Sequence, residues 1–143
     1  MTRIALVLGL GTIALAATAP DALAQSYVNQ RLNQIVGQMR NEGYGQSHLR
    51  TTGSLREGQM RTYTIRLTAG SRYAIGGVCD EDCSDLDLML YDNRGNLVDQ
   101  DEGTDDEPVV AVTARRTGSY RVRVRMYACS VEPCGFGLVV FGN

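Results

Sequence analysis

Alternation of hydrophobic and polar residues along short segments is the feature that most restricts the fold of this chain. From Met60 onward, hydrophobic residues recur at every second position, the period of a β-strand with one buried face. Turn-forming residues, mainly Gly, Asn and Ser, separate these segments at short intervals. The pattern predicts an all-β protein, an antiparallel β-sandwich of about seven to eight strands. The expected strands are residues 60–68, 72–78, 86–92, 97–98, 109–114, 120–127 and 136–141.

The same alternation predicts which side chains face the core of the sandwich. Adjacent glycines, Gly76 and Gly77, lie inside the second expected strand and predict a β-bulge there. The expected inward side chains are Tyr63, Ile65, Leu67, Tyr73, Ile75, Leu86, Leu88, Leu90, Tyr120, Val122, Val124 and Met126.

Residues 1–24 have the pattern of a signal peptide. Arg3 precedes an apolar run over 4–19, and Ala22–Ala24 has the small-residue pattern of a cleavage site, so the mature chain is expected to begin at Gln25. A retained membrane anchor is the alternative, but the apolar run is shorter than the roughly 20 residues that span a bilayer. We therefore expect an exported bacterial protein, periplasmic or secreted, with no membrane span after cleavage.

A helix is expected between the signal peptide and the sandwich. Val28, Leu32, Ile35, Val36 and Met39 form one apolar stripe at helical spacing, within a helix expected over 26–41 and capped by Ser26. The stripe is expected to pack on the chain's own sandwich, and a partner-binding face is the alternative. The expected organisation is a signal peptide over 1–24, a helical segment over 25–45 and a sandwich domain over 50–143.

Strand alternation predicts where the loops lie. If each strand reverses direction, the turns at 69–71, 93–96 and 115–119 fall at one end of the sandwich. The loops 80–85, 100–108 and 129–135 then fall at the other end. Twelve of the sixteen Asp and Glu residues lie between Asp80 and Glu107, so acidic loops and all four cysteines are expected to meet there.

The cysteines form two close pairs in a chain expected to be exported. An even count in an oxidising compartment favours disulfides, with local pairing of Cys79 with Cys83 and of Cys129 with Cys134 as the first choice. Pairing across the two loops is a further possibility that the sequence leaves open. A zinc site made of the four thiolates is the alternative chemistry, but the spacings are loose for it.

Clustered carboxylates suggest a site for a hard cation such as Ca²⁺. The spacing is not that of an EF-hand. A solvated loop and a docking surface for a basic protein partner are the alternatives. Asp87 lies mid-strand on the other face, where we expect it to bond neighbouring backbone or an outward Arg. The expected calcium ligands are Asp80, Asp82, Asp85, Asp101, Asp105 and Asp106.

The sequence offers no catalytic constellation. His48 is the only histidine and is expected in an exposed link, and no nucleophile-elbow, Walker A, dinucleotide-binding or H-E-x-x-H motif is present. No pair of carboxylates stands out for acid/base catalysis. Arg121, Arg123 and Arg125 are expected on the outer face of one strand, paired with acids of neighbouring strands or, alternatively, contacting an acidic polymer or lipid. The net charge of −2 does not suggest a nucleic-acid-binding protein.

Four segments together resemble the bacterial pre-peptidase C-terminal domain. They are 53–58 (Gly-Ser-Leu-x-Glu-Gly), 63–75 (Tyr-x-Ile-x-Leu-x-Ala-Gly-x-x-Tyr-x-Ile), 85–92 (Asp-Leu-Asp-Leu-x-Leu-Tyr-Asp) and 118–124 (Gly-x-Tyr-x-Val-x-Val). The resemblance covers about residues 50–142. It implies a jelly-roll-like sandwich without catalytic activity and a role in secretion, localisation or substrate attachment. Some members of that family bind calcium or insoluble polymers such as collagen.

This chain departs from the family in two ways. No enzyme domain is attached, and the two cysteine pairs are not general family features. The sequence therefore predicts an exported, non-catalytic binding or accessory protein with an acidic, calcium-binding pole and an unidentified protein or polymer ligand. The alternative is a structural protein of the periplasm or envelope that docks a basic partner without metal.

Overall fold

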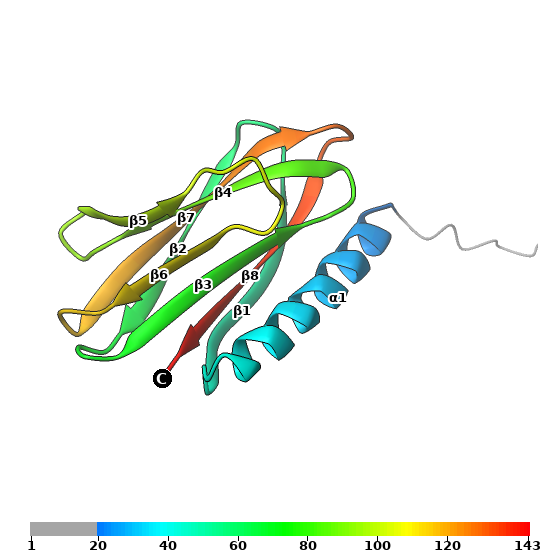
Figure 1. Ribbon diagram of the computed structural model, residues 1–143. Helices are drawn as coiled ribbons and strands as arrows, with labels where there is room; N and C mark the ends of the chain where they lie inside the picture. Colours follow the sequence, from blue (N-terminus) through cyan, green and yellow to red (C-terminus); the bar gives the residue numbers. More distant parts are fainter. Residues whose placement is uncertain (1–19) are drawn as a thin grey trace, which may run out of the picture.

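The computed structural model describes residues 20–143, so the predicted signal peptide lies outside the described residues except for its last five positions. One helix precedes eight strands (Figure 1). They are α1 (Pro20–Asn41), β1 (Gln46–Leu55), β2 (Met60–Leu67), β3 (Arg72–Cys79), β4 (Cys83–Tyr91), β5 (Leu97–Asp101), β6 (Val109–Thr113), β7 (Gly118–Cys129) and β8 (Cys134–Gly142).

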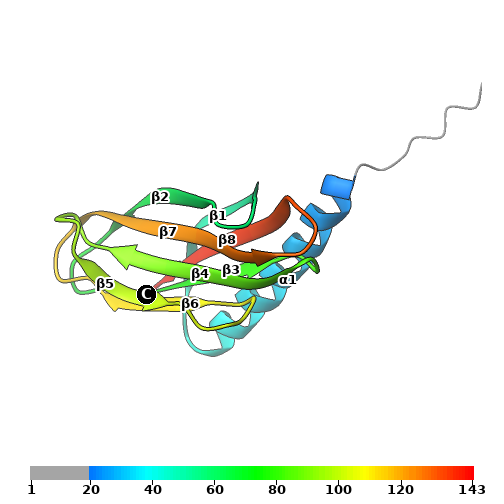
Figure 2. The same ribbon diagram turned by 90° about the horizontal axis from the view of Figure 1, so that it is seen from above.

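The strands form two antiparallel four-stranded sheets that face each other. One sheet has the order β1-β8-β3-β6 and the other β2-β7-β4-β5. Strands distant in sequence are therefore neighbours in both sheets, which is the eight-stranded jelly-roll arrangement of a β-sandwich. The two layers are seen from the side in Figure 1 and from above in Figure 2. The predicted fold class is confirmed.

Side chains from the inner faces of both sheets form one core. The inward face predicted for each strand is confirmed, because Leu86, Leu88 and Leu90 of β4 and Val122, Val124 and Met126 of β7 are all 0–1% exposed. Phe136 and Leu138 of β8 complete this core from the opposite sheet. The alternation that predicted the strands therefore also identified most of the core.

Three details of the strands differ from the prediction. The ladders of β3 run through Gly76 and Gly77 without a register shift, so the predicted bulge is absent there. The first strand was not predicted, because only Leu49 and Leu55 supply an apolar signal between Gln46 and Leu55. His48 is exposed as expected but lies in β1, at a register shift against β8, and not in a link.

Helix α1 packs on the outer face of the β1-β8-β3-β6 sheet (Figure 1). Its stripe of Val28, Leu32, Ile35 and Met39 is buried against Ala74, Val78, Val139 and Phe141, so packing on the chain's own sandwich is confirmed. The helix begins at Pro20, before the predicted start, and Ser26 therefore lies inside it instead of capping it.

A glycine on β8 lets the helix approach the sheet closely. A Cβ atom at Gly137 would lie 2.6 Å from Cδ1 of Leu32 and 2.8 Å from Cγ1 of Val28. Both distances are below the contact distance of carbon atoms, so a side chain there would push the helix away. Gly137 is thus part of the surface on which α1 rests.

Candidate functional site

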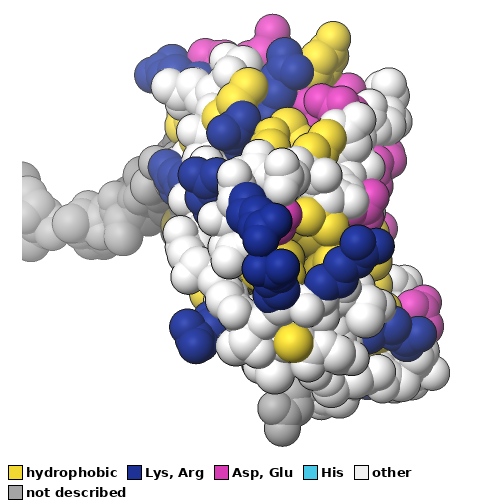
Figure 3. Space-filling view, turned by 90° about the vertical axis from the view of Figure 1, so that its left-hand side faces the viewer, with side chains coloured by type: hydrophobic (Ala, Val, Ile, Leu, Met, Phe, Trp, Pro, Cys, Tyr) yellow, Lys and Arg dark blue, Asp and Glu magenta, His cyan; other side chains and the backbone are white. Residues whose placement is uncertain are grey.

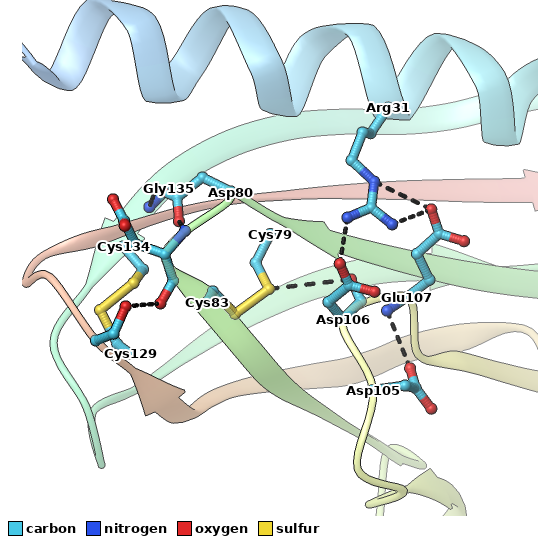
Figure 4. The surroundings of a disulfide bond; sticks show 12 residues. Arg31, Cys79, Asp80, Cys83, Asp105, Asp106, Glu107, Cys129, Cys134 and Gly135 are labelled. Carbon is cyan, nitrogen blue, oxygen red and sulfur yellow. Dashed lines mark hydrogen bonds and ion pairs between the residues drawn. A yellow bond between two sulfur atoms is a disulfide. The ribbon is translucent and has the colours of Figure 1, made fainter.

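Three loops meet at one end of the sandwich, which we call the loop pole. They are residues 80–82, 102–108 and 130–133, and backbone hydrogen bonds tie them together. Ser130 N–H donates to the Asp82 carbonyl at 2.8 Å, and Leu86 N–H donates to the Asp105 carbonyl at 2.9 Å. The predicted convergence of the acidic loops is confirmed, and Figure 4 shows their surroundings.

Two disulfides crosslink the residues of the loop pole. Cys79 is bonded to Cys83 and Cys129 to Cys134, which confirms the local pairing. Cys83 and Cys129 face each other in the ladder between β4 and β7, so the two bridges lie close together. No cysteine of the described chain is free, and a four-thiolate zinc site is therefore excluded.

Asp80 is the buried carboxylate at the centre of the crosslinked loops, with only 4% of its surface exposed. Its side chain accepts hydrogen bonds from the backbone N–H groups of Gly135 and Asp82 (Figure 4). Burial raises the pKa of Asp80, and the hydrogen bonds from these N–H groups oppose that rise. Asp80 thus joins the β3–β4 loop to β8.

Asp106 and Glu107 hold the helix to the β5–β6 loop. Arg31 of α1 forms ion pairs with both carboxylates, and its Nε also donates to Glu107 at 3.1 Å (Figure 4). The hydrogen bond from Arg31 lowers the pKa of Asp106 below its usual range. Arg31 is half-buried, so this contact connects α1 to the loop pole from the side.

Asp99 and Asp101 close the edge of the sandwich between its two sheets. Asp101 accepts a hydrogen bond from Val109 N–H at 2.9 Å, and Asp99 accepts one from Ala111 N–H at 2.8 Å. Because β6 is an edge strand, these donors have no neighbouring strand on that side. The carboxylates of Asp99 and Asp101, two residues apart in β5, therefore both point toward β6.

Two further carboxylates are buried on the outer face of the β2-β7-β4-β5 sheet. Asp87 is 2% exposed and lies 3.7 Å from Arg125, so the expected pairing with an outward Arg is confirmed. Asp85 is 6% exposed, and its Oδ1 has no hydrogen-bond partner. Burial, followed by the negative charge of Asp85, raises the pKa of Asp87 to about 6. Burial and the charge of Asp105 raise the pKa of Asp85.

The six predicted calcium ligands therefore have different surroundings. Asp80, Asp101 and Asp106 are engaged as described above, and Asp105 accepts a hydrogen bond from Glu107 N–H at 2.9 Å. Asp82 is exposed, and Asp85 is buried. Across residues 20–143, no three His, Cys, Asp or Glu side chains form a group that could hold a metal ion. Calcium binding by these residues stays a prediction.

The loop pole presents one more acidic side chain than the sequence predicted there. Glu57 joins it because the turn between β1 and β2 lies at this end, a placement that was missed together with β1, whereas Glu132 belongs to the loop after β7 that was predicted to lie here. Glu132 accepts hydrogen bonds from Glu57 N–H at 2.8 Å and from Arg56 at 3.3 Å. Val131 beside them is 62% exposed. The exposed acids of the pole are Glu57, Glu81, Asp82, Glu102, Asp105, Glu107 and Glu132.

The arginine row of β7 lies on the outer face of its sheet, as predicted. Arg125 pairs with Asp87, and the guanidinium groups of Arg123 and Arg125 lie 4.9 and 4.7 Å from the ring centres of Tyr91 and Tyr127. Such cation–π contacts stabilise an exposed strand face. Figure 3 shows a face on which Arg side chains gather with hydrophobic side chains between them and acidic ones along a border.

Comparisons with known proteins identify a fold and no family. No protein-family model matches the chain, and no curated protein matches it. Among solved structures, the chain is similar to PliG of Aeromonas hydrophila, a periplasmic lysozyme inhibitor of g-type lysozyme. The identity is 14% and the TM-score 0.53, over 71% of this chain and 90% of PliG. At this identity the similarity bears on the fold alone, and it agrees with the sandwich described above.

Proposed function

We propose that this protein is an exported, non-catalytic binding protein whose loop pole docks on a basic surface of a protein partner. One observation carries the proposal: exposed acids are displayed on loops that two disulfides, backbone hydrogen bonds and Arg31 hold in place. Loops fixed before binding lose little conformational entropy when they bind. Like charges gathered on such loops attract a partner of opposite charge and orient it.

Three of these acids are available to a partner. Among the described residues, the side chains of Glu81, Asp82 and Glu102 form no ion pair and accept no hydrogen bond, whereas the buried Asp80 and the paired Asp106 serve the fold. The exposed Val131 adds an apolar contact at the same end. A surface of this kind has the polar rim and the apolar point of contact that protein interfaces combine.

The two disulfides and the fold shared with PliG support the assignment to the exported binding proteins. Two disulfides suit a protein of an oxidising compartment. Within residues 20–143, no helix has the length and apolar character required to cross a bilayer. PliG, which shares the fold, is an inhibitor and therefore acts by binding another protein. A g-type lysozyme is accordingly the first partner to test. Membership in the pre-peptidase C-terminal family remains a proposal that the jelly-roll topology suits.

The test uses charge reversal at the two ends of the molecule. Glu81→Arg changes the loop pole, and Glu42→Arg makes the same change of charge beyond the C-terminal end of α1. Binding to purified g-type lysozyme is measured by calorimetry, together with inhibition of cell-wall lysis. We expect Glu81→Arg to weaken binding, Glu42→Arg to leave it unchanged, and added salt to weaken it through screening.

A lysozyme that does not bind would exclude that enzyme as the partner. The charge of the pole is then tested by affinity capture from a periplasmic extract with the same two variants. A partner retained equally by both variants and at high salt would contradict docking through the loop pole.

Calcium is the second candidate ligand, favoured by one observation, the buried Oδ1 of Asp85 that has no hydrogen-bond partner. A cation there would neutralise like charges that burial makes unfavourable. We expect calcium to raise the melting temperature of the protein above its value in chelator, and Asp85→Asn to remove that increase. Identical melting curves with calcium and with chelator would rule this candidate out.

A further inference from the structure

A groove lies at the end of the sandwich opposite the loop pole. It has a volume of about 700 Å³ and opens between β5 and β6, the edge strands of the two sheets. We call this end the turn pole, because the turns 68–71, 92–96 and 114–117 meet there. Hydrogen bonds join two of these turns, from Ala69 N–H to Thr117 Oγ1 at 2.9 Å and from Gly70 N–H to the Ala114 carbonyl at 2.8 Å.

The groove lies where the sandwich edge is left open. Asp99 and Asp101 close the edge toward the loop pole by capping N–H groups of β6. Farther toward the turn pole the groove is lined by Leu97 and Val98 of β5 and by Ala111, Val112 and Thr113 of β6. Leu97 is 49% exposed and Val98 39%. The walls therefore offer apolar contacts to a ligand that lies along the strands.

The charged lining of the groove is basic. Arg94, Arg115 and Arg116 line it, and in the described part of the chain none of the three forms an ion pair. Asp92 is the one acid among the lining residues. Its carboxylate is engaged by the turn itself, because it accepts hydrogen bonds from Arg94 N–H, Asn96 N–H and the Asn96 side chain at 2.8–3.0 Å. Three guanidinium groups are thus left for a ligand.

We propose that this groove binds an extended, acidic peptide segment of a partner protein. The edge of β5 can bond the backbone of an added strand, and so can β6 beyond Ala111, whose N–H is already bonded to Asp99. Leu97, Val98 and Val112 can contact alternate side chains of that strand, and the three arginines can bind its carboxylates through charge-assisted hydrogen bonds. The site is separate from the loop pole in position and opposite to it in charge, so the two ends select different partners.

A peptide suits the groove better than two other anionic ligands. A sugar polymer is expected to stack on exposed aromatic rings, but the one aromatic residue of the lining, Tyr120, is 5% exposed. An anionic membrane surface is flat and contacts protruding basic groups, whereas this site is a hollow along two strands. The shape, the apolar walls and the charge together favour a narrow, extended chain.

The experiment uses a short fluorescent peptide of alternating valine and glutamate, with a valine–lysine peptide of equal length as the control probe. Anisotropy is measured with the full mature protein and with two double variants. Arg115→Gln with Arg116→Gln alters the groove. Arg40→Gln with Arg66→Gln removes the same charge from α1 and from β2, the edge strand opposite β5. A third variant, Ala111→Trp, fills the groove without changing the charge.

We expect the glutamate peptide to bind and the lysine peptide not to bind. The Arg115/Arg116 variant should bind at least about fivefold more weakly, whereas the Arg40/Arg66 variant should bind as the unchanged protein does. Ala111→Trp should also weaken binding, and Glu81→Arg at the loop pole should not. Glu81→Arg separates the present inference from the proposed function. It tests docking at the loop pole without changing the groove, so either proposal can be contradicted while the other stands.

Three results would overturn the inference. Equal loss of binding in both arginine variants would mean that only the overall charge attracts the peptide. Equal binding of the two peptides would remove the role of the arginines. Binding of vesicles rich in anionic lipid that depends on Arg115 and Arg116, without binding of the glutamate peptide, would assign the surface to a membrane instead.

Discussion

Single carboxylates of the loop pole differ in role because they differ in burial and in hydrogen-bond donors. Asp80 and Asp82 are two residues apart, yet Asp80 is 4% exposed and bonded to two N–H groups, whereas Asp82 is exposed. The difference in burial between Asp80 and Asp82 arises from the fold, because β8 brings the N–H of Gly135 to the Asp80 carboxylate. The linear sequence places both residues in one acidic run and cannot distinguish them.

Asp80→Ala should destabilise the protein by about 1–3 kcal/mol, because it leaves the buried N–H of Gly135 without an acceptor. Asp82→Ala, the matched control, should change the free energy of unfolding by less than about 0.5 kcal/mol. Urea unfolding of the oxidised protein measures both. Equal effects of the two substitutions would show that Asp80 does not join the β3–β4 loop to β8.

The raised pKa of Asp87 makes stability depend on pH. In the folded protein Asp87 keeps its proton up to about pH 6, whereas in the unfolded chain it loses the proton near its ordinary value of 3.8. The folded state is therefore favoured below pH 3.8, and that advantage is lost as the pH rises to 6. Asp87→Asn should remove this contribution, on the order of 1–3 kcal/mol.

The measurement for Asp87 is a series of urea unfolding curves between pH 4 and pH 7 for both proteins. The difference in unfolding free energy between Asp87→Asn and the unchanged protein should shift in favour of the variant as the pH rises. A difference that stays constant across this range would contradict a raised pKa in the folded protein.

At the scale of elements, α1 and the sheet beneath it fit each other through one glycine and a stripe of apolar side chains. Gly137→Ala should destabilise the protein by about 1–3 kcal/mol, because the new methyl group would lie 2.6 Å from Leu32 Cδ1. Gly37→Ala is the opposite case, since nothing lies within 4 Å of its added Cβ in the helix. It should stabilise by about 0.5–1 kcal/mol. Thermal unfolding distinguishes the two, and a stabilising Gly137→Ala would mean that the helix packs more loosely.

The elements with strong periodicity were predictable from the sequence, and the weakly patterned one was not. Strands β4 and β7 alternate strictly, so their core faces followed from residue type alone. Strand β1 was not predicted because Thr51 and Gly53 occupy two of its inward positions, where apolar residues would have produced the alternating pattern of a strand. Its pairing with β8 is set by contacts distant in sequence, which override local preference.

The candidate site was predictable in position but not in detail. Strand alternation placed the acidic loops and cysteines at one end. Close spacing made local disulfide pairing the first choice, but only the structure excludes pairing across the loops. The pairing of Asp106 with Arg31 depends on where α1 packs on the sandwich. The hydrogen bond from Val109 N–H to Asp101 depends on how β5 and β6 lie at the sandwich edge. Neither feature is encoded within the segments that carry these residues, so short-range patterns could not reveal it.

At the scale of the whole molecule, the charges separate along the sandwich. The loop pole carries exposed acids, and the turn pole carries arginines such as Arg94, Arg115 and Arg116. A net charge of −2 conceals this division. This separation of charge lets the electric field of an approaching partner orient the molecule before contact. Each end is therefore expected to meet a surface of the opposite charge.

The two disulfides should contribute to the stability of the whole sandwich. Each closes a short loop, and the chain-entropy estimate for loops of this size is about 2 kcal/mol per bridge. Replacing Cys129 and Cys134 together by Ala should therefore lower the free energy of unfolding by roughly that amount, as measured in urea without reductant. The Cys79/Cys83 double variant provides the comparison, and no change in either variant would contradict this role.

The jelly-roll order also determines when the molecule can fold. Strand β8 lies between β1 and β3, so Gln46 pairs with Gly142, and the sheet cannot close until the last residues are present. A chain that crosses a membrane with its N-terminus first must therefore stay unfolded until translocation ends, because contacts so distant in sequence form late. For the export that we propose, the thiols would meet the oxidising compartment while the chain is still open. The topology would then keep export and folding apart in time.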